Sequence, residues 1–251
     1  MVRRTATDSG VVLSHLEFDV LWEDLDAGEQ PYPLEVASHG VTIAERDELA
    51  QGVYAGLEAD EDLDDEIGEL LFPLADPDFS VDMQLVTTEC LQILAVSRGN
   101  SGVLAVRSEA EVVLEPLRGE GVLTAVAGLM GELPPGPGEP VSMPRAAYAE
   151  ALDGFARAGY SGFENALASG GVTGRAVRAV ATLVESPRTA AGQLAANGPR
   201  ERSEVLNWFD TEAGRYLVTV QQGAEQWVTI EPAHPRRLQH RIAELLDSVT
   251  G

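Results

Sequence analysis

The sequence predicts an α+β protein in which the strands join into one antiparallel sheet. Apolar residues recur three and four positions apart near the N-terminus and again after mid-chain, which is the spacing of amphipathic helices. Between Ser80 and Leu117 apolar and polar residues alternate, which is the spacing of strands. A strand followed by an amphipathic helix also occurs twice with the same apolar spacing, which indicates an internal repeat.

The charge balance excludes several classes of partner. Among the 251 residues, 41 are acidic and 17 are basic, for a net charge of −24 at pH 7, and every basic residue is an arginine. Such a surface repels phosphate backbones and anionic lipids, so we expect no nucleic-acid partner and no membrane insertion. The apolar fraction of 44% is ordinary for a globular protein, and the length suits a single domain over residues 1–251.

Neither the cysteine content nor the apolar runs indicate an exported or membrane protein. Cys90 is the only cysteine, which rules out an internal disulfide, and its apolar surroundings predict a buried structural thiol. Arg3-Arg4 is followed only by the run Val11–Leu13, which is too short for the core of a signal peptide. The stretch Val122–Met130 is about half the length of a membrane span. We therefore expect a cytoplasmic protein.

Two capping boxes mark the first helices. Ser14 and Glu17 form the first box, and it is followed by an apolar stripe of Phe18, Leu21, Trp22 and Leu25. Two prolines end this helix, and Leu34-Glu35-Val36 is predicted to be a short strand. Thr42 and Glu45 form the second box, which opens a helix with the stripe Leu49, Val53 and Leu57.

The segment 58–69 contains eight acidic residues and no basic one. Its Asp60-x-Asp62-x-Asp64 spacing resembles the start of a calcium-binding loop. However, Asp65 occupies the position at which such a loop requires glycine, and Leu71 occupies the position of the bidentate glutamate. The segment is therefore predicted to be a solvated loop and the acidic start of a helix.

A run of strands fills the rest of the first half. Val81, Met83 and Leu85 lie on one face of the first strand. The apolar runs Leu91–Val96 and Val103–Val106 flank Ser97–Gly102, whose glycines and asparagine predict a hairpin connection. Glu111–Leu117 is the last strand, and it leads into a helix with the stripe Val122, Val126, Leu129 and Met130.

The second half starts again with helices. We expect them at 145–156 and near 162–169, and a third helix with Val177, Val180, Ala181 and Val184 on one face. Strands follow at 204–209, 215–220 and 226–231, and a last helix begins at Pro235.

The repeat relates these two halves. Leu114-Glu115-Pro116 precedes one helix and Ile230-Glu231-Pro232 precedes the other, at an offset of 116 residues. At the same offset the first helix's stripe falls on Leu238, Ile242, Leu245 and Leu246. The sequence thus predicts two related halves, at about 11–131 and 141–250, joined by a Pro/Gly linker at 132–140. Their strands would merge into one antiparallel sheet, because each half alone leaves unpaired edges.

Motifs for catalysis give little support to an enzyme. Gly99-Asn100-Ser101-Gly102 resembles a serine-protease nucleophile turn, but no histidine and aspartate accompany it on a suitable scaffold. Gly159-Tyr160-Ser161-Gly162 has the wrong spacing for a nucleophile elbow. His234 and His240 are six residues apart, which does not place them on one helical face as metal ligands. We expect no catalytic site, no cofactor and no metal.

Three C-terminal segments resemble the EspG family of actinobacteria, which serves type VII (ESX) secretion. The family pattern Phe-Asp-Thr-x-x-Gly-Arg-Tyr is present at Phe209–Tyr216. The N-terminal segment Leu16–Trp22, with Pro33-Leu34 and Thr42-x-x-Glu45-Arg46, is similar to the family's opening. The other matching segments are Trp227–Ala233 and Arg237–Leu246. The resemblance covers nearly the whole chain, and its motifs are structural rather than catalytic.

The resemblance implies a fold and a function. EspG proteins have a central antiparallel sheet flanked by two helical bundles, with a quasi-two-fold relation between their halves. They act in the cytoplasm as chaperones, bind the apolar helical tip of PPE proteins in PE-PPE heterodimers, and are not exported. This implies no cofactor, and a monomer or weak homodimer. The dense acidic run at 58–69 departs from the family pattern.

The same sequence does not look like secretion cargo. No tryptophan is followed by x-Gly, and the two Tyr-x-x-x-Glu matches, at Tyr54 and Tyr160, lie inside the predicted folded region. For partner binding we expect exposed connections of the sheet, namely Thr87, Thr88, Arg98, Gly99, Asn100 and Ser101. A client with a basic rim would suit the charge of −24 through electrostatic steering.

Two other functions stay open at this point. The chain could be a structural or scaffold component of the ESX system without a PPE client, or an enzyme whose site is not visible in the sequence. A polar cleft with perturbed pKa values would favour the enzyme. A shallow, mostly apolar patch would favour the chaperone.

Overall fold

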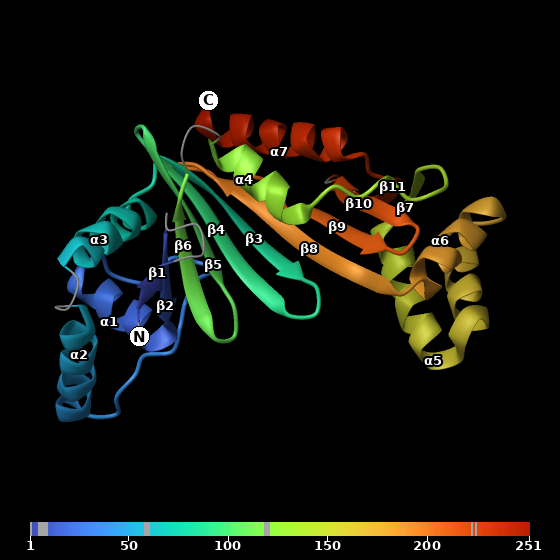
Figure 1. The fold of residues 1–251 in the computed structure, drawn as a ribbon. Helices are drawn as coiled ribbons and strands as arrows, with labels where there is room; N and C mark the ends of the chain where they lie inside the picture. The colour runs from blue at the N-terminus through green and yellow to red at the C-terminus, as the bar shows by residue number, and fades with distance from the viewer. Residues whose placement is uncertain (1, 5–9, 58–60, 118–120, 222, 224) are drawn as a thin grey trace. The chain divides into compact units, whose positions relative to one another are not determined.

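The fold is described here from a computed structural model, for residues 2–4, 10–57, 61–117, 121–221, 223 and 225–251 (Figure 1). The chain divides into two units. Unit 1 comprises residues 1–131, 194–205 and 242–251, and unit 2 comprises residues 132–193 and 206–241. Each unit is described by itself below.

Unit 1 combines a sheet with four helices and the end of a fifth. Its strands are β1 (Arg3–Arg4), β2 (Val11–Ser14), β3 (Phe79–Val86), β4 (Cys90–Arg98), β5 (Ser101–Arg107) and β6 (Glu111–Pro116). Its helices are α1 (His15–Asp24), α2 (Ile43–Leu57), α3 (Glu61–Ala75) and α4 (Gly121–Met130). The second part of β8 (Arg188–Asn197) and the last turns of α7 (Pro235–Thr250) also belong to it.

The sheet of unit 1 has helices on both faces. Its strand order is β1-β2-β6-β5-β4-β3-β8, and the pairs from β1 to β3 are antiparallel. Leu94 and Val96 on β4 belong to an apolar cluster with residues of α1, α2 and α3. Ile93 and Ala95 alternate to the other face, and α4 packs there on β3, β4 and β5.

Both predicted capping boxes are confirmed. At the start of α1, the Ser14 backbone N–H donates to the Glu17 carboxylate at 2.8 Å, and the Glu17 N–H donates to the Ser14 hydroxyl at 3.3 Å. The Thr42 and Glu45 pair is built the same way ahead of α2, at 3.1 and 3.2 Å. These reciprocal bonds satisfy backbone donors that have no partner within a helix, so the sequence locates both helix starts.

The predicted strand at Leu34-Glu35-Val36 is wrong, because this segment is an irregular loop. Leu34 is fully buried in the core of unit 1. The Val36 N–H donates to the side-chain oxygen of Gln30 at 2.6 Å, so a side chain takes the place of a neighbouring strand. The two apolar residues that suggested a strand serve instead to anchor a loop.

The contact between α1 and α2 includes a tyrosine with a perturbed pKa. The Tyr54 hydroxyl lies 2.7 Å from each carboxylate oxygen of Asp24. The hydrogen bond to Asp24, followed by partial burial and the negative charges of Asp24 and Glu23, raises the pKa of Tyr54 to about 12. A phenol that must ionise beside a carboxylate resists losing its proton, so this contact favours the folded state only while Tyr54 is protonated.

This pKa shift predicts a dependence of stability on alkaline pH. The folded pKa lies above the unfolded value of about 10, so the stabilisation is complete below about pH 10 and is lost as the pH rises through about 12. We expect the stability difference between the wild type and Tyr54→Phe to shrink across that window. Urea unfolding at several pH values measures it, and a difference that grew with pH would contradict the assignment.

Unit 2 has a smaller sheet and a helical bundle. Its strands are β7 (Val141–Pro144), the first part of β8, β9 (Leu206–Thr211), β10 (Gly214–Gln221) and β11 (Trp227–Pro232). Its helices are α5 (Arg145–Ser169), α6 (Arg175–Glu185) and the start of α7. The strand order is β8-β9-β10-β11-β7, and the pairs from β9 to β7 are antiparallel.

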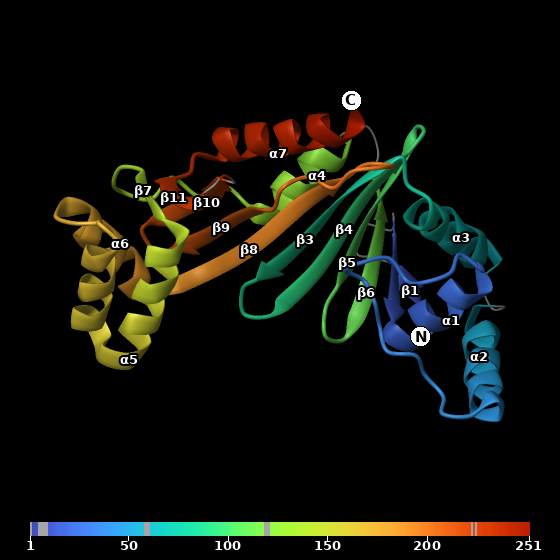
Figure 2. The same ribbon diagram turned by 180° about the vertical axis from the view of Figure 1, so that it is seen from behind.

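Helix α5 consists of two helical arms, as the sequence predicts. Ala158 and Gly159 have non-helical backbone angles and separate the arms, which diverge visibly in both views (Figures 1 and 2). The arms meet at two glycines. A Cβ atom on Gly162 would lie 2.2 Å from the Gly154 carbonyl oxygen, and one on Gly154 would lie 2.6 Å from the Gly162 oxygen. Only residues without a side chain permit this approach of two backbones.

The β9–β10 hairpin contains a buried ion pair. Arg215 is 1% exposed, and its guanidinium donates two hydrogen bonds to Asp210 on the opposite strand, Nε to Oδ1 at 2.7 Å and Nη2 to Oδ2 at 2.8 Å. Both charges lie inside unit 2, where water cannot solvate them. Each therefore depends on the other for its stability in the folded state.

The same hairpin binds the Pro/Gly segment. The Arg215 backbone N–H donates to the Pro134 carbonyl at 2.9 Å, and the Gly136 N–H donates to the Arg215 carbonyl at 3.0 Å. The Tyr216 hydroxyl donates to the Pro137 carbonyl at 2.9 Å. A Cβ atom on Gly136 would lie 2.1 Å from the Tyr216 ring. Residues 134–137 are therefore packed against β10 along their length.

The predicted α+β class with an antiparallel sheet is confirmed. The connectivity also repeats, because β2-β6-β5-β4-β3 in unit 1 and β7-β11-β10-β9-β8 in unit 2 place corresponding strands in the same order. β6 and β11 end at Pro116 and Pro232, and each leads to the helix that the repeat relates, α4 or α7. The boundaries of the two predicted halves stay a prediction. Four strands were not predicted: β1, β2, β7 and β8.

Candidate functional site

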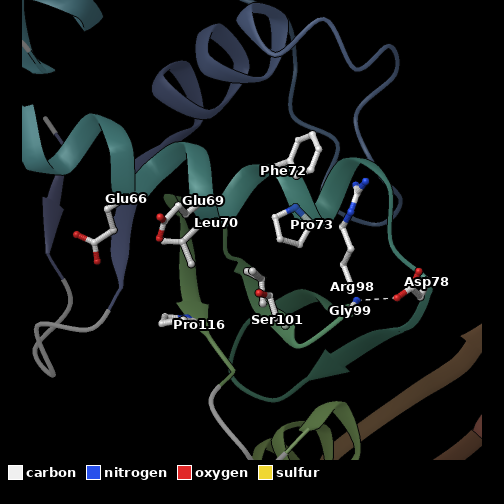
Figure 3. Close-up of a pocket in the computed structure, with 12 residues that line it drawn as sticks. Glu66, Glu69, Leu70, Phe72, Pro73, Asp78, Arg98, Gly99, Ser101 and Pro116 are labelled. Atoms are coloured by element: carbon white, nitrogen blue, oxygen red, sulfur yellow. Dashed lines mark hydrogen bonds between the residues drawn. The ribbon is translucent and has the colours of Figure 1, made fainter.

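A groove in unit 1 runs between α3 and the hairpin that joins β4 to β5 (Figure 3). We call it the α3 groove. Its volume is about 800 Å³, and it is lined by apolar residues, three carboxylates and one arginine. The carboxylates belong to Glu66, Glu69 and Asp78, and the arginine is Arg98. This combination suits the binding of a protein segment better than that of a small polar substrate.

The hairpin forms one wall of the groove because its glycines allow a tight turn. Gly99 has a φ of +56°, and its N–H donates to the Asp78 carboxylate at 2.7 Å (Figure 3). Gly102 follows Ser101 at the start of β5, and a Cβ atom on it would lie 2.9 Å from the Val96 carbonyl oxygen. The turn is therefore fixed by two glycines and by a carboxylate from the segment that precedes β3.

Helix α3 forms the other wall. Its inner face is buried in the core of unit 1 through Leu63, Ile67, Leu70, Leu71 and Leu74. Phe72 faces outward and is 53% exposed. Pro73 lies inside the helix, and it has no N–H to donate to the carbonyl of Glu69 one turn earlier. The helix thus presents an exposed aromatic ring and an additional backbone acceptor on the side of the groove.

Arg98 connects the two walls. Its guanidinium carbon lies 4.2 Å from the centre of the Phe72 ring, and its Nη2 lies 2.9 Å from a carboxylate oxygen of Asp76. Within the described part of the chain, its Nη1 has no hydrogen-bond partner although it is buried. The charge of Arg98 is thus neutralised by Asp76, and the carboxylates of the groove set its electrostatic character.

The structure brings together only part of the predicted partner-binding set. Arg98, Gly99 and Ser101 line the α3 groove, and Asn100 lies with the same turn on a smaller pocket of about 180 Å³. Thr87 and Thr88 are exposed in the turn between β3 and β4, at the opposite end of β4. The hairpin turn and the threonine turn therefore belong to different surfaces. Their role in binding stays a prediction.

The predicted burial of Cys90 is wrong. The residue is exposed, and it begins β4 opposite Val86, the last residue of β3, which is also exposed. The sequence correctly indicated a strand, but Cys90 lies at its first position, beside the turn and outside the apolar core. A thiol there is accessible to solvent and has no role in packing.

The residues that resembled catalytic motifs are not assembled into a site. Ser101 lies on the hairpin turn, and neither of the upstream histidines lines the α3 groove. The His15 ring contacts the Ser108 carbonyl at 3.1 Å, and the His39 ring contacts Asp19 at 3.3 Å. Among the residues that the structure describes, no group of three or more His, Cys, Asp or Glu side chains could hold a metal ion. Likewise, no described helix has the length and apolar character to cross a bilayer.

The acidic run extends beyond what the structure describes. Glu58–Asp60 lie outside the described residues, as do the side chains of Glu61 and Asp62. The helical part of the run forms the first turns of α3, which confirms the predicted acidic helix start. It ends at Glu69, so its last carboxylates lie on the α3 groove.

A second feature, in unit 2, is an arginine stacked on an aromatic ring. The Arg188 guanidinium carbon lies 3.4 Å from the centre of the Phe209 ring, which itself stacks on Tyr216. Desolvation by these neighbours lowers the pKa of Arg188 from its ordinary value. No carboxylate of the described residues forms an ion pair with it. Arginine on an aromatic face is typical of residues at the centre of protein interfaces, so this is a second candidate contact.

The sequence analysis missed Phe72 and Arg188. Phe72 interrupts the apolar stripe of α3, and such an interruption by an aromatic residue is the signal that could have identified an exposed ring. Arg188 has no comparable signal, because its setting depends on the pairing of β8 with β9, and β8 itself was not predicted.

Comparisons with known proteins agree on one family. The family model described as the EspG family matches residues 14–244. Among solved structures, the chain is similar to EspG5, a type VII secretion system chaperone of Mycobacterium tuberculosis in complex with a PE25-PPE41 dimer. The two chains are 18% identical, with a TM-score of 0.71 over 96% of this chain and 97% of that chain, so the similarity establishes the fold. No curated protein shows significant sequence similarity.

Proposed function

Because the chain belongs to the EspG family, we propose that it is a cytoplasmic chaperone for type VII (ESX) secretion. It binds the apolar helical tip of PE-PPE-type proteins and keeps them soluble before export. The observation that carries this proposal is the family match over residues 14–244, together with a fold shared over 96% of the chain with a chaperone in complex with its client.

Binding alone accounts for this activity, so the proposal includes no catalytic step. A helical hairpin with an apolar tip aggregates when the tip is exposed, and a protein that covers the tip prevents this. The α3 groove offers apolar side chains beside carboxylates, and Arg188 offers an aromatic and cationic surface. Both are the kinds of surface that hold a protein partner in place.

The experiment is an affinity pulldown of the tagged full chain from the cytosol of its own actinobacterium, under conditions that express type VII genes. Mass spectrometry identifies the proteins that co-purify in stoichiometric amounts. Recovery of a PE-PPE pair, or of another long helical-hairpin protein, supports the chaperone function. An unrelated protein of similar net charge carries the same tag as a control, because an acidic surface retains basic proteins without specificity.

A second measurement separates chaperone from scaffold. The recovered client is expressed with and without the chain, and its soluble fraction is compared. A chaperone raises the soluble fraction, whereas a scaffold of the secretion apparatus leaves it unchanged. Recovery of ESX membrane components without a secreted client would overturn the proposal in favour of the scaffold.

A further inference from the structure

We propose that the α3 groove docks a cationic segment of the client, in which an apolar side chain lies against Phe72 and neighbouring Arg or Lys side chains bind Glu66 and Glu69. This proposal rests on the chaperone function and assigns one surface and one ligand chemistry to it. It commits to a partner whose apolar contact residue is flanked by positive charges.

The polar groups of the groove are mostly hydrogen-bond acceptors. Glu66 and Glu69 are three residues apart on α3, and both lie on the side of the helix that faces Ser101 and Pro116 (Figure 3). Asp78 adds a third carboxylate, although one of its oxygens accepts the Gly99 N–H. Arg98 is the one cationic side chain among the lining residues, and it is paired with Asp76. The segment that fits must therefore bring donors and positive charge.

The apolar part of the groove requires more than a charged ligand. Leu70, Pro73, Val103 and Pro116 line it, and Phe72 leaves half of its surface to solvent at the rim. The ring has a cation on one side only, from Arg98. An exposed aromatic ring beside a groove is a common anchor of protein interfaces, because burying it on binding releases water from a large apolar surface.

The charge of the whole chain distinguishes among the possible occupants. A second copy would bring another −24 and its own acidic groove, so self-association at this surface is opposed by like charges. A basic segment is instead attracted over a distance of about a Debye length before contact. Charge complementarity therefore favours a client segment with Arg or Lys residues.

The test measures binding of the PE-PPE heterodimer that co-purifies with the wild-type chain. We expect Glu66→Lys/Glu69→Lys to weaken binding by about tenfold to a hundredfold, because two attractions become two repulsions. Phe72→Ala is expected to weaken it by about tenfold. Glu69→Lys alone changes an exposed position and guards against a loss of folding in the double variant, which thermal unfolding of each variant checks.

A matched control separates local contacts from net charge. Glu150 and Asp153 are also acidic, exposed and three residues apart, on α5. Glu150→Lys/Asp153→Lys changes the net charge by the same amount, and we expect binding within about twofold of the wild type at physiological salt. Equal losses for the α3 and α5 pairs would overturn the proposal, because only the overall charge would then matter.

The salt dependence gives an independent readout. Glu66→Gln/Glu69→Gln removes two charges without reversing them, so the affinity of this variant should fall less steeply with salt than that of the wild type. Full binding by both the glutamine and lysine variants would overturn the groove assignment and leave the chaperone function intact. If the wild type itself retains no client in the pulldown, the chaperone function fails, and the groove assignment fails with it.

Discussion

Replacing Asp210 by alanine is expected to lower the free energy of unfolding by about 3–5 kcal/mol, because it leaves Arg215 buried without a counter-charge. Arg215 is 1% exposed, and both of its hydrogen bonds to Asp210 are short and well aligned. The guanidinium cannot lose its proton at any ordinary pH, so the protein has no way to neutralise it. Only water entry or local unfolding would relieve the charge.

Urea unfolding followed by circular dichroism measures this loss. The matched control is Asp210→Leu/Arg215→Met, which removes both charges and keeps apolar volume in the hairpin. Apolar replacements of whole buried pairs are often neutral or stabilising, so we expect the double variant to be more stable than Asp210→Ala. A single variant that lost less than about 1 kcal/mol would show that the pair is solvated.

The second large effect is expected from Gly162→Ala in α5. The added Cβ atom would lie 2.2 Å from the Gly154 carbonyl oxygen, which belongs to the backbone of the facing arm. The two arms must separate to admit it, and Phe163 and Leu167, which are fully buried in the core of unit 2, move with them. Overpacking of this kind costs about 1–3 kcal/mol, and the rigid backbone neighbour places this case at the upper end.

Gly52→Ala provides the control for this substitution. Gly52 lies inside α2, and a Cβ atom there meets nothing within 4 Å. Alanine at an open helical position stabilises by about 0.5–1 kcal/mol, because it is the better helix former. Thermal unfolding of the two variants should therefore shift the melting temperature in opposite directions. A shift of the same sign and size would mean that the glycine contact in α5 has no role in packing.

The elements with redundant sequence signals were predicted well. The capping boxes at Ser14 and Thr42 each combine a polar start with an apolar stripe, and both helices begin where expected. The β4–β5 hairpin combines two apolar runs with a Gly-Asn connection, and its register follows from them. In such segments the local preference and the final packing agree, which is why the sequence suffices.

The elements that were missed depend on neighbours rather than on local pattern. β8 contains four alanines and a glycine within ten residues, a composition with low strand propensity. It becomes a strand because hydrogen-bonding partners in the sheet supply what its side chains do not. Leu34 shows the opposite error, since a locally strand-like triplet is held as a loop by Gln30. Tertiary context decides both cases.

The candidate site was predicted in part. The Arg98–Ser101 turn was selected as an exposed connection, and it does line a groove. The opposite wall could not be foreseen, because the outward direction of Phe72 depends on how α3 packs in unit 1. The sequence therefore indicates exposed turns, and the fold determines which turns face a helix that can complete a binding surface.

The exposure of Cys90 has a practical consequence. It is the only thiol of the chain, and it lies at the start of β4, whereas Arg98 lies at the end of the same strand. The two residues are separated by eight steps of an extended strand, or about 27 Å. A fluorophore or spin label attached to the natural sequence would thus report distances to a labelled client without touching the α3 groove.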